Sequence, residues 1–529
     1  MIVFCLDARN FLQMKFSVED AFEAISSNFD ETIVPTLVEY IRIPNLSPSF
    51  NGGKFDEPET EQVIDLFSSW VKKQSISGLS LQVRRLPERT PLMFMEVPAS
   101  SDYQGTDEVL LYGHLDKQPP FEGWVEGTGP YTPVIKDGRL YGRGGADDGY
   151  AIFGSLEAIK AIQTQNIPHS RYVILIEACE ESGSPDLPAH LAALIAENKV
   201  RDVSLVVCLD SGAGTYDAFY MTSSIRGMLM TTLTVTTLTE GVHSGGGGNI
   251  CADSFRIIRQ LLSSIENEES GEMIPELQVE VPIRKVEQNK PTVERLGNRL
   301  YDGFPLVNGI PMEPRDDLET LAINRGWRAS LTVTGIDGLP SCSKAGNVLR
   351  PSTSIKLSIR LPPTYDHTKA FDVIKSKFES VLPANAQMKL SPPVTAKGWD
   401  APISELWLER ALNEAAHAMF PGSKPGYIFE GGSIPFLGML QDMFPCAQFC
   451  VTGVLGPHSN AHGPNEFLDI EYCKRVVACV SGVLAGHGSR PLHEARATKS
   501  PRLMTHAAEA RVEVAKQDKL VQQHLASTE

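Results

Sequence analysis

Three short apolar segments of this chain each stop abruptly at acidic or imidazole side chains. The segments 109–112, 172–176 and 204–209 are apolar at nearly every consecutive position, which is typical of strands buried on both faces of a parallel sheet. Between the first two, the segment 150–163 has apolar residues at helical spacing. Strand, helix and strand in this order predict a βαβ unit, and with it an α/β fold of layered helices and sheet.

The pattern changes after residue 220. The segments 228–238 and 354–361 alternate between apolar and polar residues, as strands of a half-exposed antiparallel sheet do. A helix is predicted between them at about 251–266, followed by a long stretch at 281–347 that is rich in Pro, Gly and Asn. We therefore expect an α+β domain inserted into the α/β domain.

Helical and buried patterns return after residue 392. The segment 403–419 predicts a helix and 448–454 a strand, and two further helices are predicted near the start, at 17–42 and 61–73. The expected fold class is α/β, with a mixed, largely parallel sheet, flanking helices and an inserted α+β domain. We expect an α/β domain in two segments, residues 15–220 and 392–488, with the α+β domain inserted at residues 221–391 and a C-terminal tail at residues 489–529.

The charge and cysteine content of the chain bound its partners and its location. With 48 Lys and Arg against 65 Asp and Glu, the formal net charge is −17, which argues against nucleic acid or an anionic membrane as a partner. No apolar stretch reaches the roughly 18 residues that span a bilayer. We interpret the opening residues as neither a signal peptide nor an anchor, and Met1 and Met14 both fit a start site. The nine cysteines are scattered through apolar runs, so we expect a cytoplasmic protein.

Acidic and imidazole residues gather where the predicted strands end, which is where ligands bind in open α/β sheets. Because side chains alternate along an extended segment, His114 and Asp116 point to one side and can serve one site. The adjacent Glu180 and Glu181 should have different roles, one binding metal and one acting beside it. Many carboxylates, few imidazoles and no cysteine pair favour Zn²⁺ or Mn²⁺, and five or more ligands favour two ions sharing a bridging carboxylate. Composition alone is equally compatible with acids dispersed over the surface. The candidate set is His114, Asp116, Asp147, Glu180, Glu181, Asp210 and His462.

Ordered sequence motifs make this prediction more specific. They are GHLDKQPP (113–120), LYGRGGADDG (140–149), EACEESGS (177–184), CLDSG (208–212), GVHSG (241–245), SIRLPP (358–363), EGGSIP (430–435) and AHGPNE (461–466). Together they resemble the M20 family of dinuclear zinc metallopeptidases, whose members include dipeptidases, carboxypeptidases and N-acyl amino acid deacylases. The resemblance covers about residues 30–487. It implies that the two α/β segments form a catalytic domain and that residues 221–391 form a lid or dimerisation domain.

The resemblance implies two Zn²⁺ ions per subunit, with Mn²⁺ as an alternative. His114 and Asp210 would bind one ion, Glu181 and His462 the other, and Asp147 would bridge the two. His458 lies four residues before His462 and competes for the same role. We prefer His462, because the sequence His-Gly-Pro-Asn-Glu matches the last motif of the family.

The resemblance also implies catalytic and substrate-binding residues. Glu180 would be the general base, and Asp116 would orient the base or the His114 imidazole. His243 would reach the active site of the partner in a homodimer, and Arg360 would bind a substrate carboxylate. Without the resemblance, Arg360 would be expected on the solvent-exposed face of an alternating strand, with no role in binding. The implied substrate-binding residues are His243, Arg360, Gly432 and Ser433.

We therefore predict a metal-dependent enzyme that hydrolyses dipeptides or short peptides with a free C-terminal carboxylate. Two alternatives stay open: an N-acyl amino acid amidohydrolase of the same fold, and a metal-free binding or scaffold protein. Two positions depart from the family pattern, Lys117 in place of an aliphatic residue and Gly149 in place of a common lysine. We expect neither to touch metal.

Overall fold

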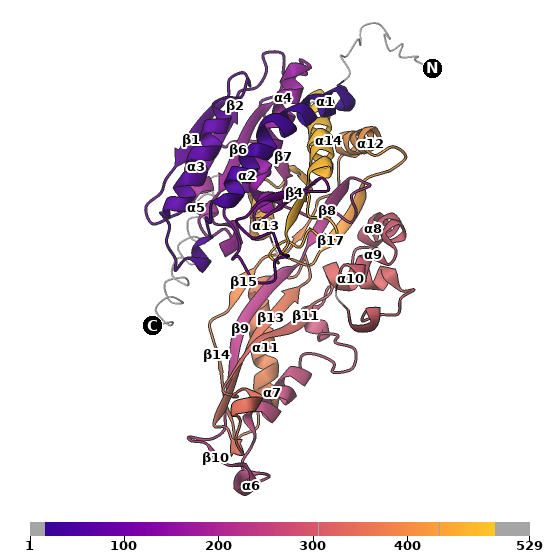
Figure 1. Ribbon diagram of the computed structural model, residues 1–529. Helices are drawn as coiled ribbons and strands as arrows, with labels where there is room; N and C mark the ends of the chain where they lie inside the picture. Colours follow the sequence, from indigo (N-terminus) through magenta and orange to yellow (C-terminus); the bar gives the residue numbers. More distant parts are fainter. Residues whose placement is uncertain (1–15, 305, 433, 492–529) are drawn as a thin grey trace, which may run out of the picture.

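The computed structural model describes residues 16–304, 306–432 and 434–491, and it centres on a six-stranded sheet (Figure 1). In the spatial order given at the end of this paragraph, the last four strands are mutually parallel, and the first two form an antiparallel pair at one edge of the sheet. The segments 109–112, 172–176 and 204–209 correspond to strands of the parallel part, which confirms the predicted βαβ unit. In spatial order the strands are β1 (Ser80–Arg84), β2 (Leu92–Val97), β6 (Arg171–Glu177), β3 (Glu108–His114), β7 (Val203–Cys208) and β18 (Gln448–Val451).

Helices cover both faces of this sheet, because successive strand residues point to opposite sides. In β3, Val109 and Leu111 belong to one buried cluster, and Leu110 and Tyr112 belong to the other. The second face is covered by α5 (Leu187–Ala196) and α13 (Pro435–Met443). The larger, first face carries α1 (Val18–Asn28), α2 (Val34–Arg42), α3 (Pro58–Val71), α4 (Ala151–Thr164), α12 (Leu406–Met419) and α14 (Ile470–Ser489).

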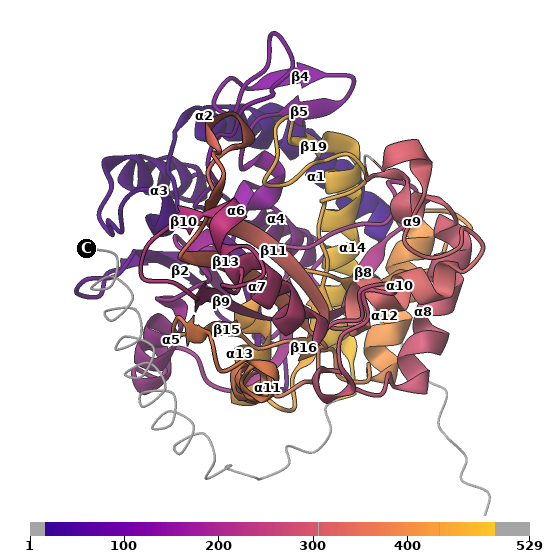
Figure 2. The ribbon, with the colours of Figure 1, turned by 90° about the horizontal axis from the view of Figure 1, so that it is seen from below.

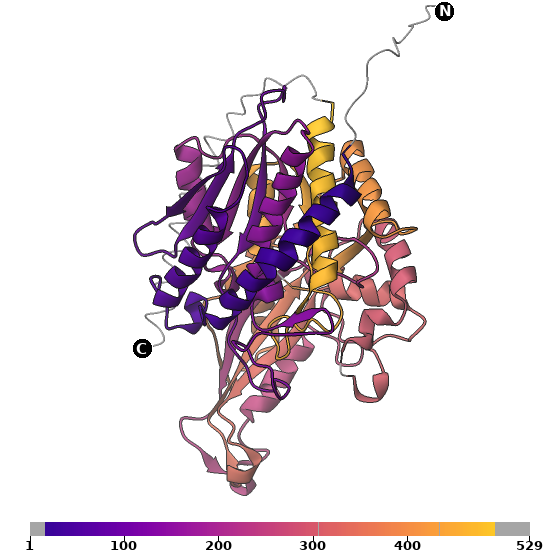
Figure 3. The same ribbon diagram turned by 45° about the horizontal axis from the view of Figure 1, so that its top comes forward.

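The predicted opening helix, 17–42, is one nearly continuous rod that crosses the sheet beside α14 (Figure 3). Ser17 caps its start by accepting a hydrogen bond from the backbone N–H of Asp20. A π-helical turn at Phe29–Ile33 joins α1 to α2, and Pro35 stands in the first turn of α2. Proline is tolerated there because the first turn does not need its N–H group, so the helix resumes rather than breaks.

A second, antiparallel sheet projects away from the first (Figure 1). One of its faces packs on α7 (Ser254–Ser263) and α11 (His367–Val381), and the burial of its central strands alternates residue by residue. The half-exposed sheet expected from segments 228–238 and 354–361 is therefore confirmed. Its strands are β11 (Ser330–Asp337), β13 (Ser352–Leu361), β9 (Gly227–Thr236) and β14 (Gln387–Leu390), with β15 (Val394–Ala396) also beside β9.

The stretch 281–347, for which no regular element was predicted, contains three helices and the edge strand β11. They are α8 (Ile283–Leu296), α9 (Arg299–Asp302) and α10 (Leu318–Trp327), and they gather at one side of the molecule (Figure 2). Pro291 lies inside α8, where it removes one backbone donor.

Among the described residues, the remaining strands form two three-stranded sheets and one two-stranded pair. The described residues contain no helix long and apolar enough to cross a membrane. Beyond residue 491, the predicted tail lies outside the described residues. The short strands are β8 (Tyr220–Ile225), β16 (Trp399–Asp400) and β17 (Gly426–Glu430) in one sheet, β4 (Val134–Lys136), β5 (Arg139–Tyr141) and β19 (Phe467–Asp469) in another, and the pair β10 (Val242–His243) and β12 (Val348–Leu349).

Candidate metal centre

The parallel strands β3, β6 and β7 end at the same edge of the sheet, and this edge carries most of the predicted site residues. β3 ends at His114, a 3₁₀ turn at Glu180–Ser182 follows β6, and Asp210 follows β7 by two residues. Because neighbouring parallel strands place their carboxyl ends together, residues nearly 100 positions apart in the chain become neighbours. The alternative in which the acids are dispersed over the surface is therefore wrong.

The first cluster consists of His114, Asp147 and Asp210, whose ligand atoms lie within 4.8 Å of one another. His114 Nε2 lies 3.4 Å from Asp147 Oδ1 and 4.0 Å from Asp210 Oδ2. All three residues are buried. This is a compact set of two carboxylates and one imidazole, aimed at a common point.

The second cluster consists of Asp147, Glu181 and His462. His462 Nε2 lies 3.1 Å from Asp147 Oδ2 and 3.2 Å from Glu181 Oε2. Asp147 thus presents Oδ1 to the first cluster and Oδ2 to the second. His462 is brought to the site by the loop before β19, and its side chain is 55% exposed. His458 is also exposed but belongs to neither cluster.

The donor set fits divalent cations. His114 Nε2 is buried and has no hydrogen-bond partner, although three carboxylates surround the ring. Burial and the neighbouring Asp147 charge raise the pKa of Glu181, and burial with nearby acids raises the pKa of Asp210 to about 7. Buried carboxylates that repel one another in this way need positive charge to remain ionised. Carboxylate oxygen and imidazole nitrogen are ligands that Zn²⁺ and Mn²⁺ accept.

Asp116 and Glu180 stand beside the clusters. The two carboxylate oxygens of Asp116 accept hydrogen bonds from the backbone N–H groups of Glu180 and Glu181, at 3.1 and 3.0 Å. His114 Nδ1 lies 3.2 Å from the backbone carbonyl oxygen of Asp116 and 3.5 Å from its Oδ1, so Asp116 positions both the imidazole and the glutamate turn. Burial and the charge of Asp210 raise the pKa of Glu180 well above its usual value.

A model of the family described as peptidase family M20/M25/M40 matches residues 110–485. The chain belongs to this family. Among curated relatives, it is 26% identical over 439 residues to a cysteinylglycine-S-conjugate dipeptidase of Corynebacterium striatum, covering 82% of this chain and 92% of the relative. It is 24% identical to a Cys-Gly metallodipeptidase of Schizosaccharomyces pombe, covering 87% and 96%.

Solved structures show the same fold. A di-peptidase from Saccharomyces cerevisiae superposes with a TM-score of 0.69 at 20% identity, covering 90% of this chain and 99% of the other. Human carnosine dipeptidase 1 gives 0.67 at 22% identity, covering 89% and 99%. The family match and the two clusters together identify this M20 chain as a metal-dependent peptidase.

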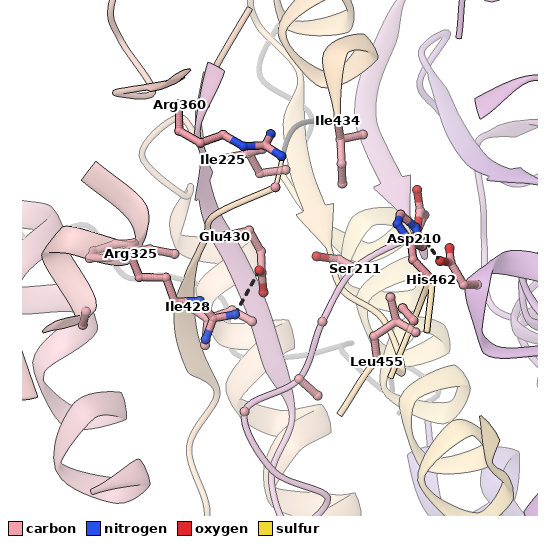
Figure 4. Close-up of a pocket in the computed structure, with 18 of the residues that line it drawn as sticks. Asp210, Ser211, Ile225, Arg325, Arg360, Ile428, Glu430, Ile434, Leu455 and His462 are labelled. Carbon is pink, nitrogen blue, oxygen red and sulfur yellow. Dashed lines mark hydrogen bonds and ion pairs between the residues drawn. The ribbon is translucent and has the colours of Figure 1, made fainter. Parts of the chain in front are cut away.

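The metal clusters of this M20 peptidase lie in a pocket of about 610 Å³ that extends toward the second sheet. Arg360 on β13 lines this pocket, as does Gly432, so Arg360 does not occupy the alternative position on a solvated strand face (Figure 4). Ser433 lies outside the described residues.

His243 is the predicted site residue that the structure leaves far from the clusters. It stands on β10, at the outer end of the projecting sheet, where it is exposed (Figure 1). Its Nδ1 accepts a hydrogen bond from the backbone N–H of Gly245 at 3.1 Å. Within one subunit, His243 therefore does not line the pocket that holds the clusters.

A buried ion pair that sequence reasoning missed holds the His462 loop in place. Arg143 Nη1 lies 2.5 Å from Glu466 Oε2, and both side chains are fully buried. Arg143 Nη2 also donates to the carbonyls of Gly463 and Pro119, at 2.9 and 3.2 Å. The guanidinium thus ties the loop after Asp116 to the loop that carries His462. Arg143 and Glu466 both lie in motifs quoted above, LYGRGGADDG and AHGPNE, and these motifs were the sequence signal that could have indicated the pair.

The two departures from the family pattern meet at one side chain, Tyr40. Lys117 is buried, its Nζ donates to the carbonyls of Tyr40 and Ile43 at 2.7 and 2.6 Å, and it lies 3.8 Å from the centre of the Tyr40 ring. A β-carbon added at Gly149 would stand 2.2 Å from Tyr40 Cε1. Tyr40 therefore excludes any side chain at position 149. Neither Lys117 nor Gly149 belongs to a metal cluster.

Proposed function

We propose that this protein hydrolyses the peptide bond of dipeptides or short peptides with a free C-terminal carboxylate, using two metal ions and Glu180 as general base. The observation that carries the proposal is the pair of three-residue clusters that share Asp147, with Glu180 on the wall of the same pocket. Asp147 would bridge two Zn²⁺ ions, or Mn²⁺ ions, with His114 and Asp210 on one and Glu181 and His462 on the other.

Divalent ions held by these residues would polarise the scissile carbonyl and lower the pKa of the attacking water. Glu180 takes the proton from that water and then delivers a proton to the leaving amine. Asp116 keeps Glu180 in position through the backbone N–H group that it binds.

Arg360 is the group proposed to bind the C-terminal carboxylate of the substrate. Its guanidinium lies on the side of the pocket away from the clusters (Figure 4). A guanidinium offers two parallel donors to a carboxylate, which fixes the orientation of the substrate as well as its charge. Backbone N–H groups of Gly432 and Ser433 are proposed to bind the same end.

A homodimer is proposed because His243 is exposed and distant from the pocket of its own subunit. Among the described residues, β11 has a strand partner on one side only, and it exposes Val333 and Ile336, which line one surface pocket together with Phe255 of α7. An exposed apolar edge of this kind is suited to pairing with a second copy of the chain. In that dimer, His243 would stabilise the oxyanion in the active site of the partner. We also propose that the domains have the limits 15–220, 221–391 and 392–488, and that the protein is cytoplasmic.

The two alternative functions differ in what they demand of these residues. A metal-free scaffold would tolerate gaps in the ligand set, whereas both three-residue clusters are complete. An N-acyl amino acid amidohydrolase would use the same clusters and the same base. It differs only in the group attached to the acyl side of the scissile bond.

Two substitutions at adjacent residues test the proposal. Glu180→Gln should keep the metal content of the wild type and lose turnover roughly 10²–10⁴-fold, because only the proton transfer is removed. Glu181→Gln is the matched control, and it should lose metal as well as turnover. Metal content is measured by elemental analysis, and turnover by mass spectrometry of a dipeptide library before and after chelation. Near-normal turnover of Glu180→Gln, or activity that survives complete metal removal, would contradict the proposal.

A further inference from the structure

One acidic side chain in the pocket has no role in the chemistry described so far. Glu430 is the last residue of β17, and its side chain is 20% exposed. Its Oε2 lies 3.2 Å from Nη2 of Arg325 on α10 (Figure 4). No hydrogen bond is assigned to Oε1 among the described residues, and Glu430 lines the same pocket as Glu180 and Asp210.

Glu430 lies close to the first metal cluster. A β-carbon added at Gly212 would stand 2.8 Å from Glu430 Oε1, so this oxygen lies against the backbone of Gly212. Gly212 follows Asp210 by two residues, and two residues span at most about 7 Å. The Glu430 carboxylate therefore lies within about 11 Å of the Asp210 α-carbon, in the wall of the same pocket.

A carboxylate in this part of the pocket is suited to a substrate amino group. In an α-amino acid, the amino nitrogen lies two bonds, or about 2.5 Å, from the carbonyl carbon. With that carbonyl at the metal clusters, the ammonium group of the N-terminal residue lies in the same pocket as Glu430, which among the described residues is the one lining acid outside the set of metal ligands and base. Arg360 and Glu430 are then charged groups of opposite sign for the two ends of a dipeptide.

We propose that Glu430 binds the free α-ammonium group of the substrate, so that the enzyme selects dipeptides over N-acyl amino acids. This inference rests on the proposed function. Arg325 holds the carboxylate toward the pocket through an ion pair that is itself partly exposed. An N-acyl substrate would set an apolar group against Glu430, which removes water from a carboxylate without supplying a new donor.

Alanyl-alanine and N-propionyl-alanine form a matched pair of substrates, because they differ only in the amino group. The wild-type enzyme should prefer alanyl-alanine in kcat/KM by roughly 10–100-fold, the effect expected of a hydrogen bond to a charged group. Glu430→Gln should lose this factor on alanyl-alanine and keep the wild-type rate on N-propionyl-alanine. Glu319→Gln, an exposed glutamate of α10 paired with Lys290, is the control and should change neither rate.

A pH profile tests the same proposal without a variant. The kcat/KM for alanyl-alanine should fall above pH 8 relative to that for N-propionyl-alanine, because the substrate ammonium loses its proton there. Equal wild-type rates on the two substrates, equal loss on both in Glu430→Gln, or identical pH profiles would each overturn the role of Glu430 while leaving amide hydrolysis intact. Failure of the metal-loaded enzyme to cleave either substrate or any dipeptide would overturn the proposed function and this inference with it.

Discussion

Arg143→Met tests how the His462 loop is held at the metal centre. The Arg143 and Glu466 side chains are both fully buried, so the substitution leaves an acidic group in the interior without its cation. Breaking a buried ion pair from one side costs roughly 3–5 kcal/mol. Burial already raises the pKa of Glu466 to about 7 beside Arg143, so the variant protonates Glu466 at neutral pH. Protonation limits the penalty, and we expect a loss of about 3 kcal/mol in the free energy of unfolding.

The assay is urea unfolding in metal-free buffer, so that metal binding does not contribute to stability. The double variant Arg143→Met/Glu466→Gln buries no unpaired charge, and it should lose less than the sum of the two single variants. A chelator competition then measures metal affinity, and the ion bound through His462 should bind roughly 10–100-fold more weakly in Arg143→Met. Unchanged affinity for both ions, despite the loss of stability, would refute the positioning role of Arg143.

Two further predictions concern the dimer and the response to acid. Mixing Glu180→Gln subunits with His243→Ala subunits should restore about a quarter of wild-type activity. Half of the dimers are then mixed, and each mixed dimer has one site with both Glu180 and His243. A mixture whose activity is only the sum of the two inactive variants would exclude sharing of His243. Burial lowers the pKa of His487 to about 4, against about 6.5 unfolded, so its contribution is complete above pH 6.5 and is lost as the pH falls toward 4. Between pH 7.5 and 4.5 the wild type should lose about 2–3 kcal/mol more stability than His487→Gln, as measured by urea unfolding at each pH, and parallel pH curves would contradict this.

The sequence predicted the parallel part of the central sheet, because its strands are apolar at consecutive positions, but not the antiparallel edge strands β1 and β2. Buried parallel strands such as β3, β6 and β7 have no solvent face, so their residues need no tertiary information to be recognised. The metal clusters could be anticipated for a related reason. Once the strands are known to be parallel, His114, Glu181 and Asp210 must meet at one edge, whatever the details of packing.

The helices of the stretch 281–347 could not be predicted in the same way. The face of α8 that packs on the protein includes Lys285 and Asn289, which are buried polar residues. Lys285 Nζ donates to the carbonyl of Ser223 at 2.8 Å, and Asn289 Nδ2 donates to that of Tyr427 at 2.7 Å. These partners are far away in the sequence, so the burial depends on tertiary hydrogen bonds. Of the buried residues of α8, only Val293 and Leu296 are apolar, so the packed face of this helix does not stand out in the sequence as an apolar stripe.

The role proposed for Glu430 could not be predicted from the sequence, for a different reason. It stands in the quoted motif EGGSIP, yet a single acid at a strand end carries no chemistry until its neighbours are known. Its proximity to Gly212 and its ion pair with Arg325 join three segments of the chain, and none of these contacts follows from the order of the strands. His243 is similar, since its proposed role depends on a surface that a single chain does not contain.

The residues proposed for hydrolysis and the residues proposed to select the substrate come from different parts of the fold. The metal ligands and Glu180 come from strand ends and loops of the α/β core, and their geometry is fixed by sheet order and by the Arg143–Glu466 pair. Arg325 and Arg360 come instead from α10 and β13, outside that core. Changes in the stretch that carries α8 to α10 can therefore alter which acyl group or ammonium group is accepted without moving a metal ligand. It follows that variants of Arg325 should change the preference between dipeptides and N-acyl amino acids at constant metal content.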